Sequence, residues 1–454
     1  MMRRLVLPLV ILLAGCAPAT QNNTASRAVF GEGILPPMKT FAPQKQAQTT
    51  KSNTGLARDF MELSFRMESG RALPVFTRFE GPVTVRMTGN PPATMKGDLN
   101  QLITRLQTEA QIPISVTTSA DANITIQAVP RSSIKKVLPQ AACFVAPNVG
   151  SIREYRSARR APQTNWTLLQ TRERLAIFIP NDSSPQEVRD CLHEELGQAL
   201  GPLNDLYRLP DSVFNDDNVH TVLTGFDMMI LRATYAPELR SGMSPQEVAT
   251  RLPAIFDRIN PAGRKQAAAP ASPTPQVWNQ SIQTALGPGA DYARRQVASD
   301  TALRIAVNEG WTDNRRAFAH YARARLLQAS DSEAARRQYE IADRFYARSP
   351  QTRLHRAYVA TQLAAYELAD GDPVAARSLV EPHISIAAQS QNASLLATLQ
   401  LLRAESFAME GRADEARAVR LDSLGWARYG FGADWVVRAK LREISALNRQ
   451  NAPA

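Results

Sequence analysis

A short stretch near the middle of the chain, HEELGQALGPLND at 193–205, carries residue types found in metal-dependent hydrolases. Two histidines four residues apart on a helix face the same way and can share a zinc ion, and a glutamate after the first histidine acts as general base. Here only His193 is present, and Glu194 and Glu195 follow it directly. The stretch therefore has the outline of a zinc-binding helix with an incomplete set of ligands.

The spacing fits the longer zinc motif of metzincin peptidases, H-E-x-x-H-x-x-G-x-x-H, when the glycines are aligned. The three ligand positions then hold Glu194, Gln198 and Asn204, and the general-base position holds Glu195. His193 lies one residue too early, about 100° away from the ligand face of the helix. The motif thus keeps its spacing while all three histidines are replaced.

The replaced ligands decide which chemistry we expect. An amide oxygen is a poor zinc ligand, because zinc prefers imidazole, thiolate or carboxylate groups. Calcium prefers oxygens, and nearby carboxylates could add to a calcium site or serve as turn and cap residues. These carboxylates are Asp205, Asp211, Asp216 and Asp217. Gln198 and Asn204 could instead tie loops together by hydrogen bonds. We predict no cofactor and no catalysis; zinc or calcium with Glu195 as general base is the alternative, and an accidental likeness is the third interpretation.

Other catalytic patterns do not occur in the sequence, which lacks G-x-S-x-G, P-loop and dinucleotide-binding fingerprints. The remaining histidines are isolated from one another in sequence and are expected to be packing or surface residues. They are His220, His320, His355 and His383. No second catalytic centre is predicted.

The N-terminus has the pattern of an export signal. Two arginines precede an apolar run, and the sequence Leu-Ala-Gly-Cys ends at Cys16. The run is too short to span a bilayer, so residues 1–15 are expected to be removed. The cysteine resembles the lipobox of bacterial lipoproteins and is predicted to be lipidated; the alternative is an ordinary signal peptide with an incidental cysteine. Ala17, which is not aspartate, favours the outer membrane in that pattern.

Export also indicates how the other cysteines and the net charge should behave. With Cys16 lipidated, Cys143 and Cys191 remain as a pair in an oxidising compartment, so we predict a disulfide between them. The formal charge is +11, but basic residues alternate with acidic ones and form no basic run. We therefore expect a solvated, periplasm-facing surface near the lipid and no nucleic-acid partner.

Composition divides the chain into parts. Residues 16–55 are rich in Gln, Thr, Pro and Lys without an apolar period, so we predict a disordered N-terminal tether. Residues 56–259 alternate strand-like and helix-like runs, which indicates an α+β domain. Its central helix should begin at Ser184, in a capping box with proline at the first position, and end at Gly201. The Pro- and Ala-rich stretch 260–277 is predicted to be a linker.

Residues 278–450 show the sequence pattern of a helical repeat. The turns ASDSEAA, DGDPVAA and EGRADEA place Ser330, Gly371 and Gly411 at intervals of 41 and 40 residues. An alanine follows each turn residue by five positions, which permits close helix crossing. A period near 40 of paired helices is typical of an α-solenoid, and the turns resemble those of tetratricopeptide repeats (TPR). The alternative is an irregular helical bundle. Repeats of this kind commonly bind a protein or peptide.

The central helix also resembles that of a proteobacterial lipoprotein family of unknown function. Its members look like degenerate zincins, with E-E-x-x-Q-x-L-G-x-x-N-D on this helix. The matching residues are Glu194, Glu195, Gln198, Leu200, Gly201, Asn204 and Asp205. SVFNDD at 212–217 and the block at 223–243 are similar to the family's closing segment. The resemblance covers about 58–250 and implies a zincin-like fold, but transfers no established activity.

Together these observations predict an α+β zincin-like domain followed by an all-α, TPR-like helical domain. The expected protein is lipid-anchored in the cell envelope and binds a protein or peptide partner through its helices. Its zincin-like domain is expected to be non-catalytic. The alternative function is a metallopeptidase with an oxygen-rich metal site that uses Glu195 as general base.

Overall fold

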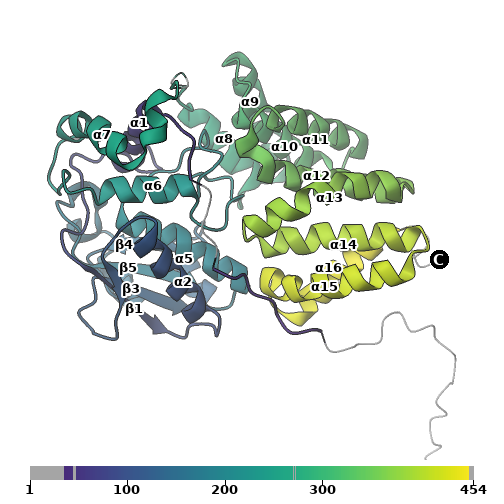
Figure 1. Ribbon diagram of the computed structural model, residues 1–454, viewed down its shortest axis with the longest axis horizontal. Helices are drawn as coiled ribbons and strands as arrows, with labels where there is room; N and C mark the ends of the chain where they lie inside the picture. Colours follow the sequence, from purple (N-terminus) through teal and green to yellow (C-terminus); the bar gives the residue numbers. More distant parts are fainter. Residues whose placement is uncertain (1–34, 44–47, 269, 271, 449–454) are drawn as a thin grey trace, which may run out of the picture. The chain divides into compact units, whose positions relative to one another are not determined.

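The computed structural model describes residues 35–43, 48–268, 270 and 272–448. From Pro36 onward the chain forms one compact unit. In this unit a mixed α/β part with a small sheet comes first and an all-helical part follows (Figure 1). The predicted signal peptide and Cys16 lie outside the described residues.

A five-stranded sheet, in the order β2-β1-β3-β5-β4, forms the centre of the α/β part. All neighbours are parallel except β4, which runs antiparallel to β5. The strands are β1 (Val83–Gly89), β2 (Ile114–Val116), β3 (Ile124–Val129), β4 (Phe144–Pro147) and β5 (Leu175–Pro180). All five strands lie within residues 56–259, so the predicted mixture of strands and helices in this part of the chain is confirmed.

Strand β5 is buried on both faces. Leu175, Ile177 and Ile179 belong to the larger core, whereas Ala176 and Phe178 belong to a second core on the other face. Since successive side chains of a strand point to opposite faces, helices must cover the sheet on both sides. Helices α2 and α5 contact one another, and α5 also contacts β5 and β4 (Figure 1).

Seven α-helices accompany the strands in the described part of residues 48–268. They are α1 (Asn53–Ser64), α2 (Met95–Thr108), α3 (Arg131–Lys135), α4 (Ile152–Ala158), α5 (Pro185–Leu200), α6 (Gly225–Thr234) and α7 (Pro245–Ile259). Short 3₁₀ turns η1 (Pro162–Thr164), η2 (Trp166–Leu168) and η3 (Pro261–Lys265) complete this part. The second core packs α3 and α4 against the sheet. Helix α5 therefore lies in the interior, between the sheet and other helices.

Helices α5 and α7 begin with the same pentapeptide and differ in their caps. Ser244 accepts a hydrogen bond from the Glu247 amide (3.3 Å), and the Glu247 carboxylate accepts one from the Ser244 amide (2.8 Å), so a full capping box forms. Ser184 likewise accepts from the Glu187 amide (3.2 Å). The Glu187 carboxylate, however, pairs with Arg131. The predicted α5 box is therefore only half formed, because a distant cation competes for the glutamate.

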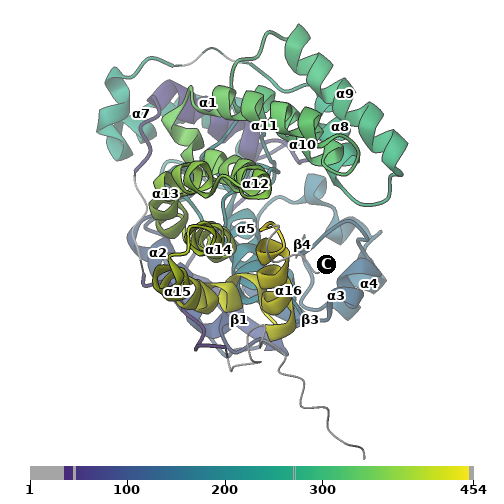
Figure 2. The same cartoon turned by 90° about the vertical axis from the view of Figure 1, so that its right-hand side faces the viewer.

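The C-terminal region consists of paired helices. They are α8 (Gln276–Leu286), α9 (Tyr292–Asn308), α10 (Asn314–Leu327), α11 (Ser332–Tyr346), α12 (Arg353–Asp370), α13 (Pro373–Gln389), α14 (Ala393–Met409), α15 (Ala413–Phe431) and α16 (Asp434–Ser445), with η4 (Pro350–Thr352) before α12. The predicted turns fall between α10 and α11, α12 and α13, and α14 and α15. Figure 2 shows α12 and α13 stacked beside α14 and α15.

Small residues after each turn allow the paired helices to pack closely. Ala335, Ala376 and Ala416 are at most 2% exposed. Gly371 and Gly411 adopt positive φ values of 87° and 76°, which glycine tolerates without steric cost. The recurrence near 40 residues in the sequence therefore corresponds to successive helical hairpins.

The described part of the N-terminal tether is packed, which differs from the prediction of a disordered segment. The Lys39 amide donates to the Gly425 carbonyl of α15 (3.0 Å), and the Phe41 ring stacks on Trp426 (4.4 Å between centroids). Helix α1 begins at Asn53, inside the predicted tether. Composition alone could not reveal these contacts, because their partners lie near the other end of the chain.

The predicted linker is also held by contacts. Arg315, only 1% exposed, donates to the Ser272 carbonyl (2.8 Å) and the Thr274 hydroxyl (3.0 Å). Shortly after it, the fully buried Trp278 ring packs edge-on against Tyr207 of the α/β part (5.0 Å). The two parts of the chain therefore share a core across this segment.

A second contact joins the start of α5 to the C-terminal helices. The Gln186 amide nitrogen donates to the Asn392 side chain (3.2 Å), and its oxygen accepts from the Ser394 amide (2.9 Å). Nearby, the Tyr429 hydroxyl donates to the Asp98 carboxylate (2.9 Å). Helix α5 is thus fixed by the sheet on one side and by α14 and α15 at its beginning.

Candidate functional site

The single histidine of the metal-like stretch has a structural partner. His193 is 5% exposed, and its Nδ1 accepts a hydrogen bond from the Leu223 amide (3.1 Å). Burial, followed by the charges of Arg105 and Arg189, lowers the pKa of His193 well below its usual value. His193 is therefore neutral and ties α5 to the segment before α6.

The predicted ligand positions differ in their burial and in their contacts. Asn204 donates its side-chain N–H to the Glu62 carbonyl of α1 (3.0 Å), which is the loop-tying role that the sequence left open. Gln198 is half-buried, and Glu194 lies four residues before it on α5. Within the described ranges, no group of three or more His, Cys, Asp or Glu residues could hold a metal ion. The donor set, one carboxylate and two amides, is a poor fit to zinc.

A buried arginine that the sequence did not predict caps the end of α5. Arg172, 3% exposed, donates to the carbonyls of Gln198 (2.6 Å), Ala199 (2.8 Å) and Gly201 (2.6 Å), and lies 5.4 Å from the Trp166 ring centre. Burial lowers its pKa to about 10, so it stays protonated at neutral pH. A cation at a helix C-terminus neutralises the exposed carbonyl dipoles. No local pattern links Arg172 to the helix, which is distant in sequence.

Several carboxyl groups lie within electrostatic reach of one another near α5. We call them the carboxyl cluster: Glu68, Glu194, Glu195, Asp205 and Asp216. Burial is the largest cause that raises the pKa of every member, and a neighbouring carboxylate raises it further in each case. Each member therefore releases its proton at a higher pH than the same group would in water.

Glu195, the predicted general base, is the most buried member of the cluster. It is 4% exposed, and its Oε2 has no hydrogen-bond partner among the residues that the structure describes. Burial and then the charges of Asp205 and Glu68 raise its pKa to about 8. At neutral pH this side chain is mostly a neutral acid.

A cavity of about 960 Å³ lies where the α/β part meets α8, α9, α10 and α12. We call it the acidic cavity, because Glu68, Asp216 and Asp217 line it. Aromatic side chains form much of the remaining wall: Tyr207, Phe318, Tyr321, Tyr346 and Tyr358. Its volume is that of a typical ligand site. Sequence reasoning missed this site, since its lining comes from segments spread over the whole described chain.

Neutral donors hold the two carboxylates at the edge of the cavity. The Gln283 side-chain nitrogen donates to Glu68 Oε1 (3.2 Å) and Asp216 Oδ2 (3.3 Å), and the Tyr207 hydroxyl donates to the same Asp216 oxygen (2.9 Å). Burial raises the pKa of Glu68 and Asp216, and the charge of Asp216 raises that of Glu68 further. An amide shared by two carboxylates leaves most of their acceptor capacity unused.

A histidine predicted to be isolated is paired across the two parts of the chain. His355 of α12 contacts Asp217 through Nε2 (2.9 Å), and Asp217 also accepts from the Asn215 side chain (2.9 Å) and the Val219 amide (3.1 Å). His355 is 2% exposed, and its Nδ1 has no partner in the described part of the chain. The contact of His355 with Asp217 corrects the expectation that this histidine is an isolated packing residue. The two residues are 138 positions apart in the sequence.

The other aspartates of this region differ in their contacts. Asp211 pairs with Lys51 (3.4 Å), and Asp227 caps α6 by accepting from the Thr224 amide (2.7 Å). Asp205 Oδ1 is buried and has no hydrogen-bond partner in the described ranges. Asp211 and Asp227 therefore serve in an ion pair and in a helix cap, whereas Asp205 Oδ1 makes no hydrogen bond to the described residues.

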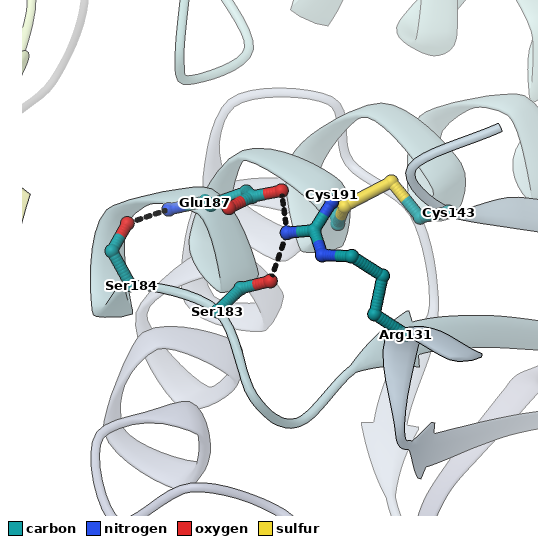
Figure 3. The surroundings of a disulfide bond; sticks show 6 residues. All are labelled: Arg131, Cys143, Ser183, Ser184, Glu187 and Cys191. Atoms are coloured by element: carbon teal, nitrogen blue, oxygen red, sulfur yellow. Dashed lines mark hydrogen bonds and ion pairs between the residues drawn. A yellow bond between two sulfur atoms is a disulfide. The ribbon is translucent and has the colours of Figure 1, made fainter. Parts of the chain in front are cut away.

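The predicted disulfide between Cys143 and Cys191 is present. It joins the residue before β4 to the middle of α5, with Cα atoms 6.0 Å apart (Figure 3). On the same side of α5, the Arg131 guanidinium reaches both Ser183 and Glu187 (Figure 3). These contacts fix the first half of α5 to the edge of the sheet.

Comparison with protein families gives a match to part of the chain. None of the helices in the described ranges has the length and apolar character needed to cross a membrane. No curated protein matches the chain. Residues 53–254, from the first residue of α1 into α7, match a family described as "protein of unknown function (DUF2927)".

Proposed function

We propose that this chain is a non-catalytic binding protein of the cell envelope, held by a lipid on Cys16, which binds a protein or peptide in the acidic cavity. In this proposal the zincin-like part and the TPR-like helices together form the binding site. The cavity carries the argument, because its volume and its mixture of aromatic and polar groups suit a ligand of several residues. Helical repeats commonly use concave surfaces for such recognition.

The contacts of the metal-like stretch support a non-catalytic role. Hydrolysis by a zincin needs an open metal that activates water. The Asn204 amide is used by the Glu62 carbonyl, and His193 is used by the Leu223 amide. These side chains stabilise loops around α5, which is the role that a former catalytic helix could keep in a binding protein.

Chemical cross-linking in intact cells tests the proposal. Thr284, an exposed residue of α8 in the cavity lining, bonds only within its own helix, to the Gln280 carbonyl (2.8 Å). We expect the full-length protein to give a discrete cross-linked complex, and Thr284→Trp to reduce its yield several-fold by filling the cavity. Thr104→Trp is the matched control, since Thr104 makes the same contact on α2 (3.0 Å to Asn100), outside the lining. Equal yields from both variants would show that the partner binds elsewhere, and absence of any complex would refute the proposal.

Lipidation has its own test. Cys16→Ser should move the protein from the membrane fraction to the soluble fraction, because a single diacylglycerol group is the anchor in this proposal. Mass spectrometry of the N-terminal peptide should show the acyl mass only in the wild type. Unchanged membrane partitioning together with an unmodified wild-type peptide would refute the anchor and leave cavity binding unaffected.

One observation favours a second candidate, a metallopeptidase with an oxygen-rich metal site. Glu195 occupies the general-base position, is buried, and has its pKa raised to about 8, close to what a general acid or base requires. Elemental analysis and peptidase assays of the purified protein distinguish the two functions. We expect no stoichiometric zinc or calcium and no hydrolysis. One tightly bound metal per chain, with proteolysis abolished by Glu195→Gln, would favour the peptidase.

A further inference from the structure

We propose that the acidic cavity selects a positively charged side chain, lysine or arginine, of the bound polypeptide. This inference rests on the proposed binding function and specifies the ligand chemistry. Its central groups are Glu68 and Asp216, which lie on the α/β side of the cavity and face Gln283 of α8. Both carboxyl groups share the single side-chain amide of Gln283 as a donor. A cation could donate further hydrogen bonds to both of them.

One acceptor in the cavity lining and two acceptors outside it are buried and have no donor in the described part of the chain. His355 lines the cavity, is 2% exposed and has a free Nδ1; since Nε2–H can donate to Asp217, Nδ1 is then an acceptor. Asn215, which bonds Asp217, has an unpartnered Oδ1 and is 3% exposed. Asp205 Oδ1 is also unpartnered, and its charge interacts with those of Glu68 and Asp216. A buried acceptor is costly when it is unsatisfied, so a ligand that offers an N–H group to His355 fits the cavity.

The groups of opposite charge in the lining lie on the helices and have partners of their own. Arg294 of α9 pairs with Asp291 (3.5 Å), and Arg325 of α10 bonds the Tyr321 hydroxyl. Neither pairs with Glu68 or Asp216, whose donors within the described chain are an amide and a phenol. The carboxyl groups on the α/β side are therefore paired with neutral donors and with neither arginine of the lining.

The lining favours an organic cation over a metal ion. Within residues 35–43, 48–268, 270 and 272–448, the carboxylates are not arranged in a group that could hold a metal. The cavity instead adds the rings of Tyr207, Phe318, Tyr346 and Tyr358. Aromatic faces attract ammonium and guanidinium groups and cover the methylene stem of a long side chain. A lysine or arginine side chain matches both the carboxylates and the rings.

Two peptides that differ only in charge test the inference. The probes are acetyl-Ala₃-Lys-Ala₃-amide and the same peptide with norleucine, titrated calorimetrically into the full-length protein in detergent. We expect saturable binding of the lysine peptide and at least about tenfold weaker binding of the norleucine peptide, because norleucine lacks the charge that would pair with Glu68 and Asp216. Equal affinities would overturn charge selection while leaving the binding function intact. No saturable binding of either peptide would also overturn the inference; the cross-linking result then decides the binding function independently.

A variant that supplies the cation internally provides a second measurement. Gln283→Lys places an ammonium group beside Glu68 and Asp216, so we expect it to raise the melting temperature and to lower lysine-peptide affinity at least about tenfold. Glu381→Gln on α13 is the matched control, because this carboxylate pairs with Arg403 (2.9 Å) outside the lining. It should leave peptide affinity unchanged. Unaltered binding by Gln283→Lys would overturn the assignment of Glu68 and Asp216.

Discussion

Two nearby residues of α5, His193 and Glu195, both favour the uncharged form because their pKa values are shifted in opposite directions. Burial lowers the pKa of His193 and raises that of Glu195, and each shift favours the uncharged form. The middle of the helix can therefore lie inside the protein without counterions. Catalysis would require one of these groups to ionise or bind a metal, whereas a helix that supports loops does not.

The pKa of Glu195 predicts how stability depends on pH. Its folded value of about 8 lies above its ordinary value of 4.5, so the folded chain binds this proton more tightly than the unfolded chain does. The stabilisation is fully present below about pH 4.5 and is lost as pH rises through 8. Glu195→Gln should therefore stabilise the protein at pH 9 by on the order of 3 kcal/mol, since one pKa unit corresponds to about 1.4 kcal/mol.

Denaturant unfolding at pH 5 and pH 9 checks this prediction. The variant and the wild type should be similar at pH 5 and diverge at pH 9. Glu340→Gln, a substitution of a glutamate in an exposed ion pair with Arg336, should show no such divergence. A wild-type stability that does not fall between these pH values relative to Glu195→Gln would contradict the raised pKa.

At the scale of the element, α5 is held at three places. Its beginning contacts α14 through Gln186, its middle is bonded to the residue before β4 through Cys191, and its end is capped by Arg172. The helix is thus fixed along its whole length, and the residues after it enter the loop that borders the acidic cavity. Stabilising α5 should therefore also stabilise the loop that borders this cavity.

Removing the Arg172 cap should destabilise the fold strongly. Arg172→Met keeps the apolar stem but leaves three buried carbonyl groups without donors, so we expect a loss of about 3 kcal/mol in unfolding free energy. Arg174→Met is the matched control, since Arg174 pairs with Glu154 at the surface and should contribute less than about 1 kcal/mol. Equal losses for both, measured by urea unfolding, would contradict the capping role.

At the scale of the whole molecule, the α/β part and the helices depend on one another. Trp278 packs on Tyr207, and Ser394 bonds Gln186. His355 pairs with Asp217 across the same boundary. Since Tyr207, Asp217 and His355 line the acidic cavity, the relative position of the two parts sets its shape. Binding and stability should therefore be coupled.

This dependence predicts that residues 278–454 alone will be less stable than the same helices in the full chain. Trp278, fully buried in the whole protein, would lose its contact with Tyr207. We expect its fluorescence emission to shift to the red and thermal unfolding to lose cooperativity, because burying a large aromatic side chain contributes about 3 kcal/mol. A fragment that unfolds cooperatively at the temperature of the full-length protein would show that the helices form an independent domain.

The sequence by itself determined the local elements, because caps, turns and apolar periods act over a few residues. Ser184 and Gly201 set the ends of α5, and the recurring glycine turns set the helical hairpins. The pairing of Cys143 with Cys191 followed from their number once the compartment was inferred. The packed tether and the held linker did not follow, since their composition resembles that of free segments.

Only the tertiary structure decided what those elements surround. The Arg172 cap and the His355–Asp217 pair join segments far apart in sequence, so no local sequence pattern predicts these contacts. The acidic cavity has the same origin, because Glu68 and Gln283 approach each other only after the two parts pack together. The sequence at 193–205 showed the spacing of a zinc-binding helix. The partners of its side chains depended on which distant residues packed around α5.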